Sequence, residues 1–406
     1  MGRTKRGSEE ILDGHILGTV RSTCRPAVLL SMLVTAGAAT TVAALRPDTP
    51  VLPIATCLGC SVRNPFVALQ PGGGAVAWEL GIFGGLEARR LDSAGLPVGP
   101  GILLAFFRDA VLGPLDVAPD GTPWLTFATT AQPRELVFSQ VSNNRREFVI
   151  RSSTEMPDFE PGGVVALGGS NVMTSFEDLR SDGISRQWVW RLGVPPPPDQ
   201  PRHVSSTQGR GRPRICPRPN GSFVVAWRTL LHGSYGVAYS LRGPNGEELR
   251  AATALVSNLT AEPNHALACA RDGRFAIAWE SSVHPGAQGS DVQVQRFDRQ
   301  ARRVPRLDLA HAATAGDQRF AALAFEPGGA LLAAFQSVVG GHQRIFARRF
   351  AANGVPDGVE RRVDSGPGEV GEKGPGHPGI AAVGTAGRAL VVWSEGHHIL
   401  GRKLRR

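Results

Sequence analysis

The sequence lacks the signals of a helical protein. Its apolar residues do not recur with the 3.6-residue period of an amphipathic helix, and this absence excludes helical and leucine-rich repeat architectures. Aromatic residues are scarce, at 6% of the 406 residues, whereas the chain holds 50 glycines and 31 prolines. Such a composition is typical of many short strands that are joined by tight turns.

The signatures of the common catalytic and nucleotide-binding sites are also missing. The sequence contains no GxSxG nucleophile elbow, no HExxH metal motif, no phosphate-cradling loop and no GxGxxG between a strand and a helix. No spacing of His, Asp and Glu has the specificity of a metal site. The sequence therefore predicts neither a cofactor nor a metal.

What the sequence does contain is a repeat. The stretch GSFVVAW, which ends at Trp227, combines a turn that tolerates positive φ with a buried strand of β-forming residues. Six similar stretches end in an aromatic residue, at Trp78, Phe127, Phe176, Trp279, Phe335 and Trp393. Successive aromatic positions are 49, 49, 51, 52, 56 and 58 residues apart, a period that is typical of propellers and solenoids.

Each repeat divides into four short strands. An apolar run such as Pro65–Leu69 precedes the aromatic strand, an alternating run such as Leu86–Leu91 follows it, and a glycine-bearing turn leads to a last strand, as at Ala251–Val256. About fifty residues with four antiparallel strands correspond to one propeller blade. An array of two-layer sandwiches is the remaining all-β alternative.

The two ends of the repeat array favour the propeller. The last copy stops at Arg406 after three strands, and a spare strand-like segment at 49–55 precedes the first copy. Pairing these two segments would complete a ring and remove its open edges. We therefore predict one all-β domain over residues 45–406, a seven-bladed β-propeller of four-stranded antiparallel blades, in which an N-terminal strand completes the last blade.

Residues 1–44 are predicted to be a polar leader and a signal peptide. The apolar segment Ala27–Ala44 follows Arg21 and Arg25 and ends in small residues that suit cleavage. The alternative is an uncleaved membrane anchor, which is the only way in which the sequence predicts a membrane contact. Export to the periplasm, the cell surface or the medium is the expected localisation.

The net charge of +9 comes from basic residues that are scattered along the chain. Binding of nucleic acid would require one face to collect them, so the sequence predicts no nucleic-acid partner. It favours a monomer with a solvated basic surface.

The cysteines of the predicted domain fall into two pairs. Cys57 and Cys60 form a CxxC that lacks a second pair of zinc ligands, and in an exported protein we expect a local disulfide there. Cys216 lies four residues before its turn, whereas Cys269 lies three residues before the next. Their side chains should then point to opposite faces, so we expect two buried free thiols.

Alignment of the copies on this turn also identifies candidate channel residues. The residue four before the turn is small in six copies, as expected for strands that crowd around an axis, and is Asp116 in the second copy. Asp116 could line the channel or cap its own turn near Pro119–Gly121. His265 and His377 begin their innermost strands, with Arg214 nearby, so these residues could lie at the channel mouth or be ordinary surface residues.

The copies resemble repeats of the form G-F-V-V-A-W followed by A-x-R-F-D-x-x-G, which are found in exported bacterial propeller-like proteins. The resemblance covers about residues 60–406 and implies the architecture without an activity. Three functions remain open: a binding module that holds a protein or glycan through the loops of one face, a hydrolase or lyase that acts in the central depression, and a structural component of the cell envelope. The absence of a recognisable catalytic set favours the binding module over the enzyme, for which Asp116, Arg214, His265 and His377 are the candidate groups.

Overall fold

The computed structural model describes residues 45–406, except for the segments 82–84, 107–109, 130–132, 142–144, 152–157, 170, 181, 194–199, 209, 282–288, 313–315, 340, 366–375 and 385–386. The predicted leader and signal peptide, residues 1–44, lie outside the described residues, so these two assignments stay predictions. In the described part we find no helix with the length and apolar character needed to cross a membrane.

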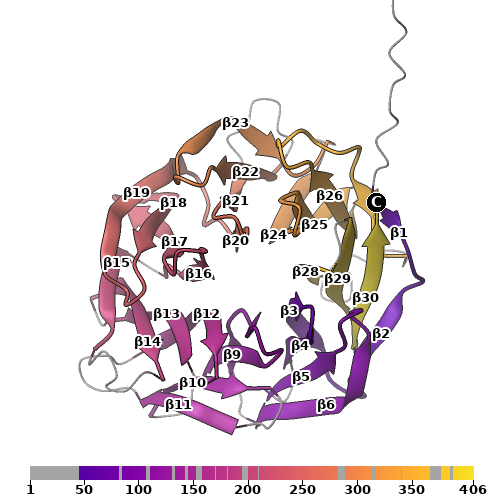
Figure 1. Ribbon diagram of the computed structural model, residues 1–406, viewed down its shortest axis with the longest axis horizontal. Helices are drawn as coiled ribbons and strands as arrows, with labels where there is room; N and C mark the ends of the chain where they lie inside the picture. The colour runs from indigo at the N-terminus through magenta and orange to yellow at the C-terminus, as the bar shows by residue number, and fades with distance from the viewer. Residues whose placement is uncertain are drawn as a thin grey trace, which may run out of the picture. The chain divides into compact units, whose positions relative to one another are not determined.

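The described residues fold into seven antiparallel sheets that are arranged as a ring around a central axis (Figure 1). The chain runs around the ring once, so consecutive sheets are neighbours and the last strand returns to the first. This arrangement is the predicted seven-bladed β-propeller, and the alternative of a sandwich array is excluded. In each blade the first strand along the chain lies innermost.

Blades 1 to 4 take up the first part of the ring. Blade 1 contains β3 (Val62–Gln70), β4 (Gly73–Leu80), β5 (Gly85–Leu91) and β6 (Pro97–Phe106). In blade 2 the innermost position is shared by two short strands, and the strands are β7 (Val111–Leu112), β8 (Asp116–Val117), β9 (Pro123–Ala128), β10 (Glu135–Gln140) and β11 (Arg145–Arg151). Blade 3 contains β12 (Phe159–Gly168), β13 (Asn171–Leu179), β14 (Ile184–Leu192) and β15 (Arg202–Gln208). Blade 4 contains β16 (Arg214–Pro217), β17 (Phe223–Leu231), β18 (Ser234–Arg242) and β19 (Glu248–Leu259).

Blades 5 to 7 complete the ring. Blade 5 contains β20 (His265–Cys269), β21 (Phe275–Ser281), β22 (Asp291–Phe297) and β23 (Arg303–Leu309). Blade 6 contains β24 (Asp317–Phe325), β25 (Leu331–Val339), β26 (His342–Phe350) and β27 (Arg361–Arg362). Blade 7 contains β28 (Gly376–Ala382), β29 (Arg388–Glu395), β30 (His398–Arg405) and, from the other end of the domain, β1 (Arg46–Pro47) and β2 (Leu52–Thr56).

The ring is closed as predicted. Strand β30 pairs antiparallel with β2, with Leu52 opposite Gly401, and also with β1, with Arg46 opposite Arg405. Ile54 of β2 is buried among residues of blades 1 and 7. The N-terminal strands therefore supply the outermost strand that the last copy lacks.

The core lies between the blades. In the described residues there are seven clusters of buried apolar side chains, and each combines residues of two neighbouring blades. The seven repeat aromatics lie inside these clusters, and all are at most 3% exposed. The repeat is visible in the sequence because every blade buries one large side chain against the preceding blade.

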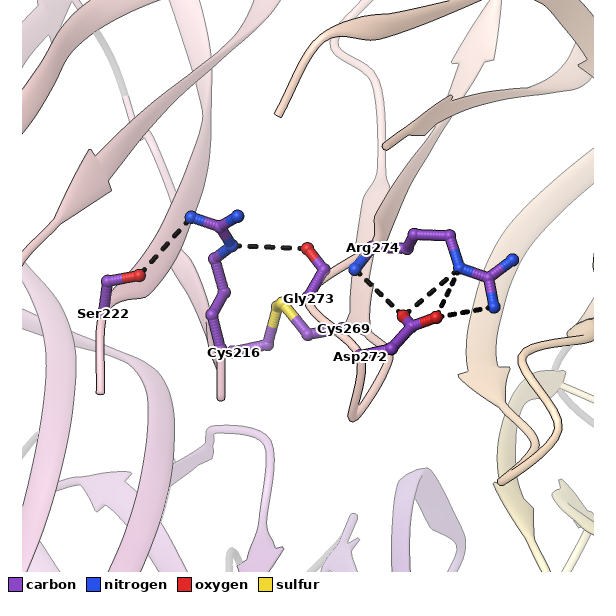
Figure 2. The surroundings of a disulfide bond; sticks show 7 residues. Cys216, Ser222, Cys269, Asp272, Gly273 and Arg274 are labelled. Atoms are coloured by element: carbon purple, nitrogen blue, oxygen red, sulfur yellow. Dashed lines mark hydrogen bonds and ion pairs between the residues drawn. A yellow bond between two sulfur atoms is a disulfide. The ribbon is translucent and has the colours of Figure 1, made fainter. Parts of the chain in front are cut away.

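Both cysteine pairs form disulfides. The local bridge Cys57–Cys60 is confirmed, with 5.5 Å between the Cα atoms. The expectation of free thiols at Cys216 and Cys269 is wrong, because these residues form a bridge between blades 4 and 5 with a Cα–Cα distance of 5.7 Å (Figure 2). The two side chains do leave opposite faces of their sheets. In a propeller, however, opposite faces of successive blades are the surfaces that meet.

Candidate functional site

The seven innermost strands surround a channel that contains a cavity of about 660 Å³. All of them run in the same direction along the axis, so the channel has a mouth, where these strands begin, and a turn end, where they reach the turn before the aromatic strand. The predicted small residues do not fill the channel. Five of them line the cavity, at Ala68, Cys216, Ala268, Ala324 and Ala382.

Arg214, at the start of β16, extends across the channel near its mouth. Its guanidinium carbon lies 5.5 Å from the centre of the Phe66 ring, which belongs to β3 on the far side of the ring of blades. Among the described residues no carboxylate lies within ion-pair distance of Arg214. Burial lowers the pKa of Arg214 to about 10, and the neighbouring Arg212 and Arg228 add to this effect. Arg214 is still charged at neutral pH, so the channel holds a cation without a bonded counter-ion.

His265 begins β20 beside this cation and is only 8% exposed. Its Nε2 atom lies 3.3 Å from the backbone oxygen of Ala226 in blade 4. Burial lowers the pKa of His265 well below its ordinary value, and the charges of Arg214 and Arg228 lower it further. The imidazole is therefore uncharged at neutral pH, and it lines the cavity together with Arg214.

Asp116 also lines the cavity, from the short inner strand β8 of blade 2. Its Oδ2 atom accepts a hydrogen bond of 3.0 Å from the backbone N–H of Ala166 in blade 3. An innermost strand has no neighbour on its channel side, so this carboxylate satisfies an N–H group that would otherwise lack a partner. The turn nearby is capped by Asp120 instead, whose Oδ1 accepts the N–H of Thr122 at 2.9 Å.

Burial raises the pKa of Asp116 to about 6, against the opposing effect of the N–H groups of Ala166 and Val117. Its charge thus changes within the physiological range. In the described part of the chain Asp116 and Arg214 do not form an ion pair.

His377 lies at the mouth, one residue into β28. Its ring stacks on Phe320 of blade 6, with 3.7 Å between the ring centres and 22° between the planes. Solvent reaches the side chain, yet the surrounding protein lowers the pKa of His377 to about 4, with a further contribution from Arg212. The structure thus places Arg214 and His265 together, whereas Asp116 and His377 lie at separate places on the channel.

The mouth carries one further arginine that the sequence did not single out. Arg212 has a left-handed backbone, with φ of 47°, just before β16. Its N–H and that of Gly211 donate to Oε2 of Glu177, at 2.9 and 2.5 Å, and its side chain forms an ion pair of 3.3 Å with Glu160. Glu177 thus holds the backbone that leads into Arg214.

Glu177 belongs to a set of three buried or half-buried carboxylates that join neighbouring blades. Glu79, Glu177 and Glu280 each follow a repeat aromatic directly. Each accepts a backbone N–H from the segment that begins the next blade, at Leu112, Gly211 and Phe320 respectively. Burial raises the pKa of Glu177 to about 7, and the charge of Glu160 raises it too. An acid directly after the aromatic was the available sequence signal for this role.

Metal ligation has no obvious place in the described part of the chain, which contains no group of three or more His, Cys, Asp and Glu side chains arranged to hold an ion. The prediction that the protein needs no metal or cofactor stays a prediction. The chemistry that the channel offers comes from the guanidinium of Arg214, the neutral imidazole of His265 and the carboxyl group of Asp116.

Comparison with known proteins identifies the architecture. No protein-family model matches the chain, and no curated protein matches its sequence. Among solved structures, it is similar to a protein of unknown function from Dyadobacter fermentans, with a TM-score of 0.54 and 10% identity over 89% of this chain and 99% of that one. It is also similar to a PL25 ulvan lyase bound to -[GlcA(1-4)Rha3S]-, with a TM-score of 0.52 and 9% identity over 86% and 95%.

A third similar structure is that of a prolyl endopeptidase, with a TM-score of 0.51 and 16% identity. The match covers 84% of this chain and 47% of the endopeptidase, so the chain spans about half of that protein. At these identities the likeness concerns the fold alone. The chain is therefore a seven-bladed β-propeller, similar in fold to this ulvan lyase and to part of this prolyl endopeptidase.

Proposed function

We propose that the protein is an exported binding module that takes an acidic sugar residue of a glycan into the mouth of its central channel. The observation that carries this proposal is Arg214, a charged group that lines the cavity and has no carboxylate partner among the described residues. A desolvated guanidinium without a counter-ion favours an anionic ligand, and its planar fork matches a carboxylate or sulfate group.

The surroundings of Arg214 support a saccharide as the carrier of the negative charge. A ligand site typically combines apolar and aromatic walls with a few polar groups, and a volume of about 660 Å³ lies in the usual range for small ligands. Phe66 offers a ring face beside the guanidinium, and Phe320 and His377 offer a second planar surface at the mouth. The ulvan lyase of similar fold is bound to a saccharide that contains glucuronate.

Two features support export. The N-terminal segment has the layout of a secretory signal, and the domain contains the bridges Cys57–Cys60 and Cys216–Cys269. Disulfides persist in oxidising compartments and are rare in the cytosol.

A second candidate function is cleavage of the same kind of ligand by a lyase or hydrolase. It is favoured by the uncharged imidazole of His265, because a neutral histidine beside a substrate-binding arginine could accept a proton. Against it, Asp116 does not approach this histidine through any described contact. Incubation with acidic oligosaccharides distinguishes the two functions, since an enzyme shortens them and a binding module returns them intact.

Calorimetric titration with galacturonate and with galactose tests the proposal. The two sugars differ in one carboxylate. We expect galacturonate and glucuronate to bind, and galactose to bind at least about tenfold more weakly, because a hydrogen bond to a charged group usually contributes that much affinity. Equal affinity for the acid and the neutral sugar would show that Arg214 is not the recognition element.

The affinity for an acidic sugar should also depend on pH. The pKa of Asp116 is about 6, so above this pH its carboxylate repels an anionic ligand in the same channel, and below it the group is neutral. We expect the affinity for galacturonate to rise roughly three- to tenfold as the pH falls from about 7.5 to about 5. Burial lowers the pKa of His265 well below its ordinary value, so this histidine is uncharged at the upper end of this range.

The variant Asp116→Asn isolates this effect from Glu177, whose pKa of about 7 falls in the same window. Asparagine keeps an oxygen that can accept the Ala166 N–H but carries no charge. The variant should bind galacturonate more tightly than the wild type near pH 7.5 and equally well near pH 5. An unchanged pH profile in Asp116→Asn would assign the dependence to another group.

A further inference from the structure

The turn end of the channel carries a side-chain contact that spans the axis. At the turn end, the Nη2 atom of Arg271 in blade 5 donates a hydrogen bond of 2.9 Å to Oε1 of Gln70 in blade 1. Blades 1 and 5 are not neighbours in the ring, so this contact spans the axis. Both residues line the cavity, and they therefore form a bar across its turn end.

Two other charged side chains that line the cavity toward the turn end, Arg218 and Glu326, are engaged with the protein. The guanidinium of Arg218 donates to the backbone oxygens of Gly273 and Arg299, at 3.3 and 2.5 Å. Glu326 forms an ion pair of 2.9 Å with Arg349. These two groups are therefore less available to a ligand than the guanidinium of Arg214, which has no carboxylate partner among the described residues and lies over the ring of Phe66.

The position of Arg214 along the axis limits how a chain can reach it. Arg214 lines the cavity, whereas Arg212, two residues before it at the mouth, does not. The Arg214 side chain crosses the channel to Phe66. A sugar in the middle of a polymer that lies over the mouth would have to bend both of its flanking chains out through the same opening.

We infer that the channel binds the terminal residue of an acidic glycan and does not bind residues in the middle of the chain. This inference rests on the proposed function. The bar formed by Arg271 and Gln70 prevents a polymer from threading through the axis, so a carboxylate that reaches Arg214 belongs to a chain end. The ligand that the protein recognises is thus an oligosaccharide or polysaccharide that ends in a uronate.

The number of protein molecules bound per glycan chain tests this inference. Size-defined oligomers of galacturonate, alginate and hyaluronan are titrated into the full-length protein, and the stoichiometry is measured by calorimetry and by sedimentation. We expect one protein per acceptable chain end at every length, and full competition by the corresponding monomeric uronate. A number of bound molecules that grows with chain length would overturn the inference and leave the proposed function standing.

Two further outcomes keep the failures apart. If none of these glycans or monomers binds, the proposed function itself is overturned. If a short peptide with a free C-terminal carboxylate binds while the uronates do not, the channel recognises a terminal carboxylate of a peptide and the glycan proposal fails. The variant Arg271→Ala removes the bar, so the number of protein molecules bound per glycan should then grow with chain length; a number that stays at one per chain end would show that the bar does not limit threading.

Discussion

Replacement of Arg214 by methionine is expected to reduce the affinity for an acidic sugar roughly 10- to 100-fold, which is the usual contribution of a hydrogen bond to a charged group. Methionine retains an unbranched apolar chain that can lie against Phe66, so the channel wall keeps its packing. The loss should appear for galacturonate and not for galactose. Calorimetric titration of both sugars measures it.

The same substitution should stabilise the fold. Arg214 is a poorly solvated charge without a carboxylate partner among the described residues, and two further arginines lower its pKa. Replacing such a group by an apolar one often stabilises a protein, here by about 1 kcal/mol. Lower affinity together with a higher thermal unfolding temperature would indicate that Arg214 serves binding and lowers the stability of the fold.

Arg212→Met is the matched control. It removes the same charge two residues away, but Arg212 is half exposed and forms an ion pair with Glu160. Exposed ion pairs contribute little, so we expect less than about a threefold change in affinity. Equal losses in Arg212→Met and Arg214→Met would mean that the whole basic mouth attracts the ligand without a specific contact.

Removal of the bridge between blades 4 and 5 should have the largest effect on stability. Cys216 and Cys269 are separated by 53 residues, and closing a loop of this length stabilises a protein by about 4 kcal/mol in the chain-entropy model. The double variant Cys216→Ala/Cys269→Ala should therefore unfold at clearly lower denaturant concentration. Denaturant titration measures the difference.

The bridge Cys57–Cys60 provides the comparison, because it closes a loop with a separation of only three residues. Its removal in Cys57→Ala/Cys60→Ala should lower the free energy of unfolding by less than removal of the Cys216–Cys269 bridge does. Peptide mapping of the unreduced protein should recover the Cys216 and Cys269 peptides joined to each other. Recovery of these two peptides as free thiols would contradict the assignment of the bridge.

The fold could be predicted from the sequence because its determinants are local and repeated. Each blade needs one turn and one large buried side chain at the same place, and residues such as Trp227 and Gly221 make both visible. The closure by β2 was predictable because one copy lacks a strand and one spare strand exists. These inferences need only the order of strands along the chain.

The candidate site was predicted less completely because its contacts cross the ring. Arg214 and Phe66 belong to blades 4 and 1, and Arg271 and Gln70 to blades 5 and 1. Whether side chains meet across the axis depends on the channel width, which no local pattern encodes. The sequence therefore indicated Arg214 and His265 as neighbours of the channel, without indicating that Arg214 lies over the Phe66 ring and lacks a carboxylate partner among the described residues.

The error at Cys216 and Cys269 has a similar origin. The alternation of side chains along each strand was assigned correctly, with the two residues on opposite faces. The conclusion drawn from it was wrong, because one face of blade 4 packs against the opposite face of blade 5. Side chains on opposite faces of these two sheets can therefore meet. The left-handed backbone at Arg212 was also missed, since its support by Glu177 comes from the neighbouring blade.

The most direct test of the account is a crystal structure of the protein with the uronate that binds most tightly. The account predicts that the sugar lies inside the mouth of the channel, with its carboxylate hydrogen-bonded to the guanidinium of Arg214 and the sugar ring near Phe66. A uronate bound on the outer strands of the ring, with Arg214 still against Phe66 and the channel free of sugar, would contradict it.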